Sequence, residues 1–370
     1  DHLPSEDAPA WARLKSAGAL LQGKTNLHEL GMGATNINPH YGPTRNPWDL
    51  ERVPGGSSGG TAAAVAAGLA LAGLGTDAGG SVRIPAALCG VVGLKQTHGL
   101  VPVRGGIGFG NPTVDHIGPI ARSVEDAALL LSLMAGPDSR DPTTVAAPRP
   151  ADYVAAARRG AAEPGLRGLR VGVPSDFYFD GIDPGVEAAV RAAIERLAGQ
   201  GAEIVAVALP DHDALMAGVS GLGAEALVYH DRWLRSRFDD YGQDLQVRLL
   251  AAQLITASDY AKGLRARRLL GERYAAALAA VDLIAAPTVP IPAPTIEDAR
   301  DTFQLQILSR NTRASNLTGL PAISLPCGLA AGLPVGLQLI GRAFDEETLL
   351  RVAAAYEATT DWHTLTPPIC

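Results

Sequence analysis

The chain has 370 residues, of which 47% are hydrophobic, and its formal net charge is −7. This length and apolar content suffice for a large buried core, which excludes global disorder. A net negative charge does not favour binding to nucleic acid or to an anionic membrane, so we expect neither as a direct partner. Three cysteines without a CxxC pair predict neither a disulfide framework nor a zinc site. No apolar run is long enough to span a bilayer, so we expect a soluble, cytoplasmic protein.

The first elements in chain order are a predicted helix over residues 9–17 and a short predicted strand over residues 19–22. Residues 61–73 are rich in alanine and lack proline, which favours a buried helix. Residues 91–94 then predict a strand, and residues 98–118 read as a glycine-rich loop. The amino-terminal part is therefore expected to alternate short elements with loops.

The middle of the chain predicts a helix over residues 122–134 and an exposed linker over residues 137–150. A β-α-β unit follows, with strands over residues 169–173 and 202–209 around a helix over residues 184–198. The residues expected to face inward from this helix are Val186, Val190, Ile194 and Leu197.

The rest of the chain begins with a helical tract over residues 211–280, interrupted near residues 221–223 and 241–242. A short apolar strand is predicted over residues 281–286. A pair of strands within residues 316–340 and a helix over residues 349–358 close the chain.

Two glycine-and-serine clusters flank the alanine-rich segment, at residues 55–60 and 79–81. Glycines before a serine remove Cβ atoms, so backbone N–H groups can close around a developing oxyanion while the hydroxyl stays reachable. Ser81 is therefore a candidate nucleophile. Composition alone also allows a flexible linker at residues 55–60. A phosphate loop is disfavoured, because no lysine follows Gly79 and Gly80 as the Walker pattern requires.

Three sequence motifs follow one another in this region and form one pattern. They are GGSSGG at residues 55–60, GTDAGGSVRIP at 75–85 and CGVVGLKQT at 89–97. Their order, and the 24 positions between Ser57 and Ser81, resemble the amidase signature family. Further similar stretches are GKTN at the start of residues 23–48, GPIAR at 118–122 and the carboxyl-terminal pair of strands. The resemblance implies one α/β domain over residues 1–370, with a mixed central β-sheet surrounded by many α-helices.

The resemblance also implies roles for individual residues. Ser81 would be the acylated nucleophile, and Ser57, entered through a cis Gly56–Ser57 peptide, would pass the proton onward to a lysine. The implied donors to the oxyanion are the backbone N–H groups of Ala78, Gly79, Gly80 and Ser81. The family hydrolyses small-molecule amides through an acyl-serine, and we expect neither a metal nor an organic cofactor.

Supporting roles are expected for Ser58, Asp77 and Arg83, which match the signature and would hold the two loops by hydrogen bonds. The loop formed by Gly31, Met32 and Gly33 matches one that approaches the substrate in the family. A loop that only covers the sheet is the alternative there. His28, His40 and Cys327 lack a recognisable catalytic partner and are expected to be structural.

The lysine of the family's Ser-Ser-Lys arrangement lies upstream of the position that matches Asp1. Lys24 and Lys95 stand in other motifs of the family, and we expect both to be structural. Serine is a weak nucleophile without a base, so this chain is predicted to be inactive until the upstream segment is supplied.

Three functions remain open. An amidase is the first, because residues 311–316 look closer to free-standing amidases. The second is the glutamine-hydrolysing A subunit of a tRNA-dependent amidotransferase, which would have other subunits as partners. A non-catalytic or truncated scaffold is the third. A homodimer is compatible with the first.

Overall fold

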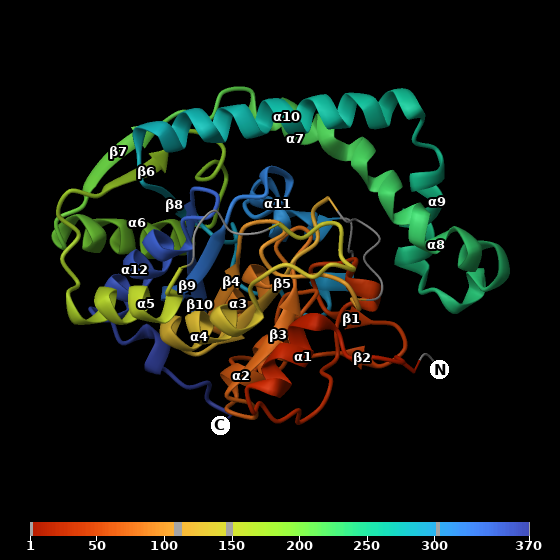
Figure 1. The fold of residues 1–370 in the computed structure, drawn as a ribbon, viewed down its shortest axis with the longest axis horizontal. Helices are drawn as coiled ribbons and strands as arrows, with labels where there is room; N and C mark the ends of the chain where they lie inside the picture. Colours follow the sequence, from red (N-terminus) through yellow and green to blue (C-terminus); the bar gives the residue numbers. More distant parts are fainter. Residues whose placement is uncertain (1–2, 107–112, 146–150, 301–303, 370) are drawn as a thin grey trace.

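The computed structural model describes residues 3–106, 113–145, 151–300 and 304–369. Its main sheet has eight strands in the order β3-β5-β4-β9-β10-β8-β6-β7, with helices around it (Figure 1). Neighbours from β3 to β8 in this order are antiparallel, whereas β8, β6 and β7 are parallel. The expected α/β fold with a mixed sheet is therefore confirmed.

The bounds of the strands are β1 Ile37–Asn38, β2 Gly42–Pro43, β3 Ala72–Thr76, β4 Val92–Lys95, β5 Ile117–Ala121, β6 Arg170–Pro174, β7 Glu203–Val207, β8 Leu283–Pro287, β9 Ala322–Ala330 and β10 Leu333–Gly341. Strands β1 and β2 form a separate antiparallel pair. The short 3-10 helices are η1 Glu29–Gly31, η2 Val219–Ala224, η3 Phe238–Asp240, η4 Asp298–Arg300, η5 Gln304–Ser309 and η6 Trp362–Thr364.

The largest hydrophobic cluster joins the sheet to α1 Pro9–Ser16, α4 Val124–Met134, α5 Tyr153–Ala162, α6 Pro184–Gly199 and α12 Glu346–Glu357. The four α6 residues that were expected to face inward are all buried in it. Side chains alternate between the two faces of a strand. Leu337 and Leu339 of β10 therefore enter this cluster, while Gln338 between them points to the opposite face.

The remaining helices build separate clusters beyond that face. They are α2 Gly59–Ala66, α3 Arg83–Cys89, α7 His212–Gly218, α8 Glu225–Ser236, α9 Gln243–Gln253, α10 Ala257–Ala280 and α11 Arg313–Thr318. In Figure 1, α10 runs along one side of the molecule, and α8 and α9 lie beyond one of its ends. The breaks expected in the helical tract are present as η2 and η3.

Two expected elements are wrong. The helix expected over residues 61–73 ends at Ala66, because Gly68 turns into the left-handed region with φ +71° and the chain re-enters the sheet as β3. No strand forms over residues 19–22, where Leu20 is 91% exposed. Strand β5 and helix α5 were not expected at all. Part of the expected linker, residues 146–150, lies outside the described residues.

Candidate active site

The two serine loops lie against each other. The N–H of Ser58 donates to the carbonyl oxygen of Ser81 with 3.2 Å between the atoms. The Ser58 hydroxyl accepts from the N–H of Thr76 at 3.0 Å, and Thr76 is the last residue of β3. The peptide bond between Gly56 and Ser57 is cis. Helix α2 starts directly after the first loop and α3 directly after the second, so both serines precede a helix.

The two candidate hydroxyls differ in their surroundings. Ser57 is fully buried, and its Oγ has no hydrogen-bond partner among the described residues. Ser81 keeps 8% of its surface exposed. A buried hydroxyl without a partner is rare, because it loses its hydration without compensation. The structure thus leaves Ser81 reachable from solvent and the Ser57 hydroxyl without a partner among the described residues.

Asp77 and Arg83 form a buried ion pair beneath the second loop. The guanidinium donates to both carboxylate oxygens of Asp77 at 3.0 Å. Asp77 also accepts from the N–H groups of Gly80, at 2.7 Å, and Val82, at 3.3 Å. Burial alone would raise the pKa of the Asp77 carboxyl, but the charge and hydrogen bonds of Arg83, followed by the charge of Lys95 and the amide of Asn316, hold it well below its usual range.

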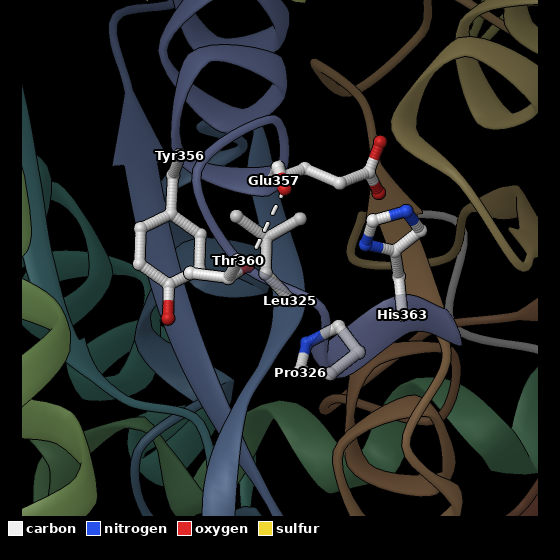
Figure 2. Close-up of a pocket in the computed structure, with 6 residues that line it drawn as sticks. All are labelled: Leu325, Pro326, Tyr356, Glu357, Thr360 and His363. Atoms are coloured by element: carbon white, nitrogen blue, oxygen red, sulfur yellow. Dashed lines mark hydrogen bonds between the residues drawn. The ribbon is translucent and has the colours of Figure 1, made fainter. Parts of the chain in front are cut away.

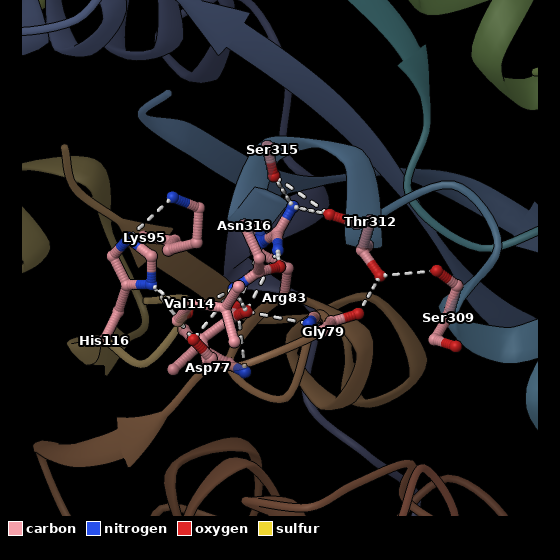
Figure 3. Close-up of polar contacts among 12 residues, drawn as sticks. Asp77, Gly79, Arg83, Lys95, Val114, His116, Ser309, Thr312, Ser315 and Asn316 are labelled. Atoms are coloured by element: carbon pink, nitrogen blue, oxygen red, sulfur yellow. Dashed lines mark hydrogen bonds and ion pairs between the residues drawn. The ribbon is translucent and has the colours of Figure 1, made fainter. Parts of the chain in front are cut away.

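Helix α11 ties this pair to the far end of the chain (Figure 3). Arg83 donates to the side chains of Ser315 and Gln338 at 2.6 Å and of Asn316 at 2.7 Å. The amide of Asn316 in turn donates to the carbonyl and carboxylate oxygens of Asp77 at 2.8 Å. Asp77 and Arg83 thus link the second loop to α11 and β10 by hydrogen bonds.

Thr312 fixes the tip of the loop. Its hydroxyl donates to the carbonyl oxygen of Gly79 at 2.6 Å. Gly80 has φ +125°, and a Cβ at this position would lie 2.1 Å from the Thr312 hydroxyl oxygen. Only glycine therefore satisfies both the backbone conformation and the close approach of α11.

The backbone N–H groups of the loop fall into two sets. The N–H of Gly80 donates to Asp77 and is occupied. The part of the chain that the structure describes offers no acceptor to the N–H groups of Ala78, Gly79 and Ser81. Three of the four expected oxyanion donors are thus available in this geometry.

Lys95 and His116 form a buried contact behind the loop (Figure 3). The Lys95 amine lies 3.2 Å from Nε2 of His116, whose Nδ1 lies 2.7 Å from the Val114 carbonyl and 3.1 Å from that of Asp77. Carbonyls only accept, so Nδ1 carries the proton and Nε2 accepts from Lys95. Burial, then the charge of Arg83, lowers the pKa of Lys95 well below its usual value.

The loop of Gly31, Met32 and Gly33 lies beside the first serine. The N–H of His28 donates to the carbonyl oxygen of Ser57 at 3.0 Å. A Cβ on Gly56 would lie 3.1 Å from the carbonyl oxygen of Gly33, and one on Gly33 would lie 2.2 Å from Nε2 of His28. Met32 packs against the cluster formed by α8 and α9. The loop therefore bridges the first serine and these helices.

The other residues considered from the sequence lie elsewhere. His40 contacts Glu29 at 2.8 Å, and Lys24 is exposed. Burial raises the pKa of the Cys89 and Cys327 thiols, which suits packing rather than nucleophilic attack. Among the described residues no group of three or more potential ligands is placed to hold a metal ion, and no helix is long and apolar enough to cross a membrane.

A separate hollow lies between β9, α12 and η6 (Figure 2). Its lining residues are Leu325, Pro326, Tyr356, Glu357, Thr360 and His363. None of these is a candidate site residue, and neither Ser57 nor Ser81 lines the hollow.

Several contacts at the site were missed from the sequence. Asn316 and Thr312 stand in a stretch that was compared with amidases, but nothing local indicates that they contact residues 77 to 83. His116 was passed over inside an expected loop. The contacts of all three residues arise only in the folded chain, because their partners lie far away in the sequence. No local pattern indicates them.

Comparison with known proteins places this geometry in a family. The sequence profile described as Amidase matches residues 1–350. The A subunit of glutamyl-tRNA(Gln) amidotransferase from Roseiflexus sp. (strain RS-1) is 45% identical, covering 100% of this chain and 80% of that protein. Its counterpart of the same name from Methanosarcina acetivorans is 41% identical, covering 99% of this chain and 81% of that protein.

Solved structures agree. The A subunit of glutamyl-tRNA(Gln) amidotransferase from Thermotoga maritima superposes with a TM-score of 0.83 at 37% identity, covering 96% of this chain and 77% of that one. A 6-aminohexanoate cyclic dimer hydrolase superposes with a TM-score of 0.85 at 32% identity, covering 99% and 80%. With the profile match over most of its length, the chain belongs to the amidase family.

Proposed function

We propose that this protein hydrolyses carboxylic amides through an acyl-enzyme formed on Ser81. The observation that carries the proposal is the hydrogen bond from Ser58 to the carbonyl of the partly exposed Ser81, since the residue before Ser58 is the buried Ser57 with its unpartnered hydroxyl. A hydroxyl nucleophile needs a proton acceptor during attack, and the proposal assigns this role to the Ser57 hydroxyl.

In the proposed first half-reaction, the Ser81 Oγ bonds to the amide carbon. Its proton moves to Ser57, whose own proton moves to a lysine that the family resemblance places upstream of residue 1. The N–H groups of Ala78, Gly79 and Ser81, which have no acceptor among the described residues, would stabilise the oxyanion. When the C–N bond breaks, the leaving amine or ammonia takes up a proton. Water then cleaves the acyl-serine and releases the acid.

Covalent labelling tests this proposal. A fluorophosphonate should label the full-length protein at Ser81, as mapped by mass spectrometry of peptides, and Ser81→Ala should remove the label. An exposed serine such as Ser236, substituted by alanine, provides the matched control and should leave labelling unchanged. Labelling that persists in Ser81→Ala would remove Ser81 from the nucleophile's role.

A second candidate is favoured by the relatives that are named as A subunits of glutamyl-tRNA(Gln) amidotransferase, at 41–45% identity over nearly the whole chain. Under it, the same serine would release ammonia from glutamine for another subunit. Steady-state assays separate the two functions. An amidase should hydrolyse simple or aryl amides alone, whereas a glutaminase subunit should prefer glutamine and co-purify with partner subunits.

A further inference from the structure

Arg313, the first residue of α11, lies beside the proposed oxyanion loop. Its Cγ would be 3.5 Å from a Cβ built on Gly79, so the side chain passes close to that residue. The neighbouring Thr312 holds the Gly79 carbonyl by its hydrogen bond. This places the Arg313 side chain at the loop whose N–H groups face the reacting carbonyl in the proposed mechanism.

The guanidinium of Arg313 has no partner in the part of the chain that the structure describes, neither a hydrogen bond nor an ion pair. Yet the residue is half-buried. The nearby Arg310 shows the usual situation, since it donates to the carbonyls of Phe177 and Asp180 and stacks over the Phe177 ring. A guanidinium carries five donors, and those of Arg313 have no protein acceptor to satisfy them among the described residues.

Arg248 is a charged neighbour of Arg313. Burial, and then the charge of Arg248, lowers its pKa from the usual value, so Arg248 lies close enough to repel it. Arg248 belongs to α9 and binds both carboxylate oxygens of Asp244 at 3.0 Å. The Asp244 carboxylate is thus engaged with Arg248, and no carboxylate among the described residues is paired with Arg313.

We propose that Arg313 binds a carboxylate on the acyl part of the substrate, so that the amides cleaved at Ser81 come from acids with a second, ionised carboxyl group. The planar fork of a guanidinium matches a carboxylate with two parallel hydrogen bonds. This inference rests on the proposed function, because it names the substrate class of that site. Free monoamides of dicarboxylic acids and glutamine share this chemistry.

Equilibrium binding tests the inference without turnover. In a Ser81→Ala background, isothermal titration calorimetry compares succinamate, its neutral analogue butyramide, and L-glutamine. We expect succinamate to bind at least ten times more tightly than butyramide. Arg313→Met should weaken succinamate roughly 10- to 100-fold, the usual range for a lost charge-assisted pair, and leave butyramide unchanged. Arg313→Lys keeps the charge without the planar fork, so its affinity for succinamate should lie between those of the Ser81→Ala parent and of Arg313→Met.

The matched control is Arg268→Met, which removes an exposed arginine paired with Glu272 on α10 and should change neither affinity. Equal affinity for succinamate and butyramide, or a succinamate affinity unaffected by Arg313→Met, would overturn the inference. L-glutamine bound more tightly than succinamate, with the same dependence on Arg313, would identify an amino acid as the source of the carboxylate. Loss of Ser81 labelling in the parent protein would instead refute the proposed function, a result independent of these affinities.

Discussion

The N–H of Ser58 and the carbonyl oxygen of Ser81 are 3.2 Å apart and form a direct hydrogen bond between the two serine loops. Both partners are main-chain atoms, so the contact fixes the separation of the loops whatever side chains they carry. The hydroxyl of Ser57, one residue earlier, has no partner of its own among the described residues. The backbone of the site is therefore held together without using the groups that the proposed reaction needs.

Ser57→Ala should slow the labelling of Ser81 by a fluorophosphonate by about 100-fold or more, since general-base catalysis contributes about 10²–10⁴. Its melting temperature should stay equal or rise slightly, because the variant removes a buried oxygen that makes no hydrogen bond in the described structure. Labelling rates and differential scanning calorimetry measure both effects. A large drop in melting temperature would show that the hydroxyl is structural.

Arg83→Met should lower the free energy of unfolding by about 3–5 kcal/mol, the usual loss when one partner of a buried ion pair is removed. It also removes the hydrogen bonds to Ser315, Gln338 and Asn316. Urea unfolding measures the change. Arg191→Met, which breaks an exposed pair with Glu187, is the control and should cost less than about 1 kcal/mol. Similar losses in the two variants would contradict the structural role of Arg83.

The same ion pair predicts sensitivity to acid. The folded protein holds the pKa of Asp77 below its usual value of 3.8, so this group stabilises the fold above that pH. The stabilisation is lost as the pH falls below 3.8, because the unfolded chain takes up the proton first. The free energy of unfolding, measured in urea at pH values from 5 to 2.5, should fall over this range. Asp77→Asn should make it less dependent on pH.

Glu357 should destabilise the fold as the pH rises. Burial raises its pKa from 4.5 to about 7, although its carboxylate accepts from the N–H of Val124 at 3.0 Å. Protonated Glu357 makes its full contribution to the free energy of unfolding below pH 4.5. About 3 kcal/mol of this contribution is lost as the pH rises through 7. Glu357→Gln should therefore be more stable than the parent at pH 8 but equal to it at pH 4.5. Glu195→Gln, on an exposed part of α6, should differ by less than about 0.5 kcal/mol at both pH values.

His116 should carry its proton on Nδ1 and stay neutral from pH 5 to pH 8. Two carbonyls contact Nδ1, the Lys95 amine contacts Nε2, and burial, followed by the charge of Lys95, keeps the pKa of the ring well below its usual value. Long-range ¹H–¹⁵N correlation spectra report the tautomer directly, with His116→Gln as the assignment control. A ring that titrates near pH 6.5, or that carries its proton on Nε2, would contradict the arrangement.

Local patterns in the sequence predicted part of this structure. The β-α-β unit around α6 follows from the alternation of strand and helix periods, and the two glycine-and-serine loops were located by their glycines. Strand β5 was missed because a five-residue segment containing glycine and proline takes its structure from its neighbours β3 and β4. The partners of Asp77 and the unpaired state of Arg313 depend on contacts between distant segments, for which one sequence carries no local signal.

The hydrogen bonds from Asn316 to Asp77 span 239 positions. A ribosome therefore makes the two serine loops well before it makes α11, whose side chains hold the second loop. A nascent chain that stalls before α11 therefore leaves the aspartate and its arginine without these contacts. The second serine loop thus gains its side-chain supports only after α11 has been made.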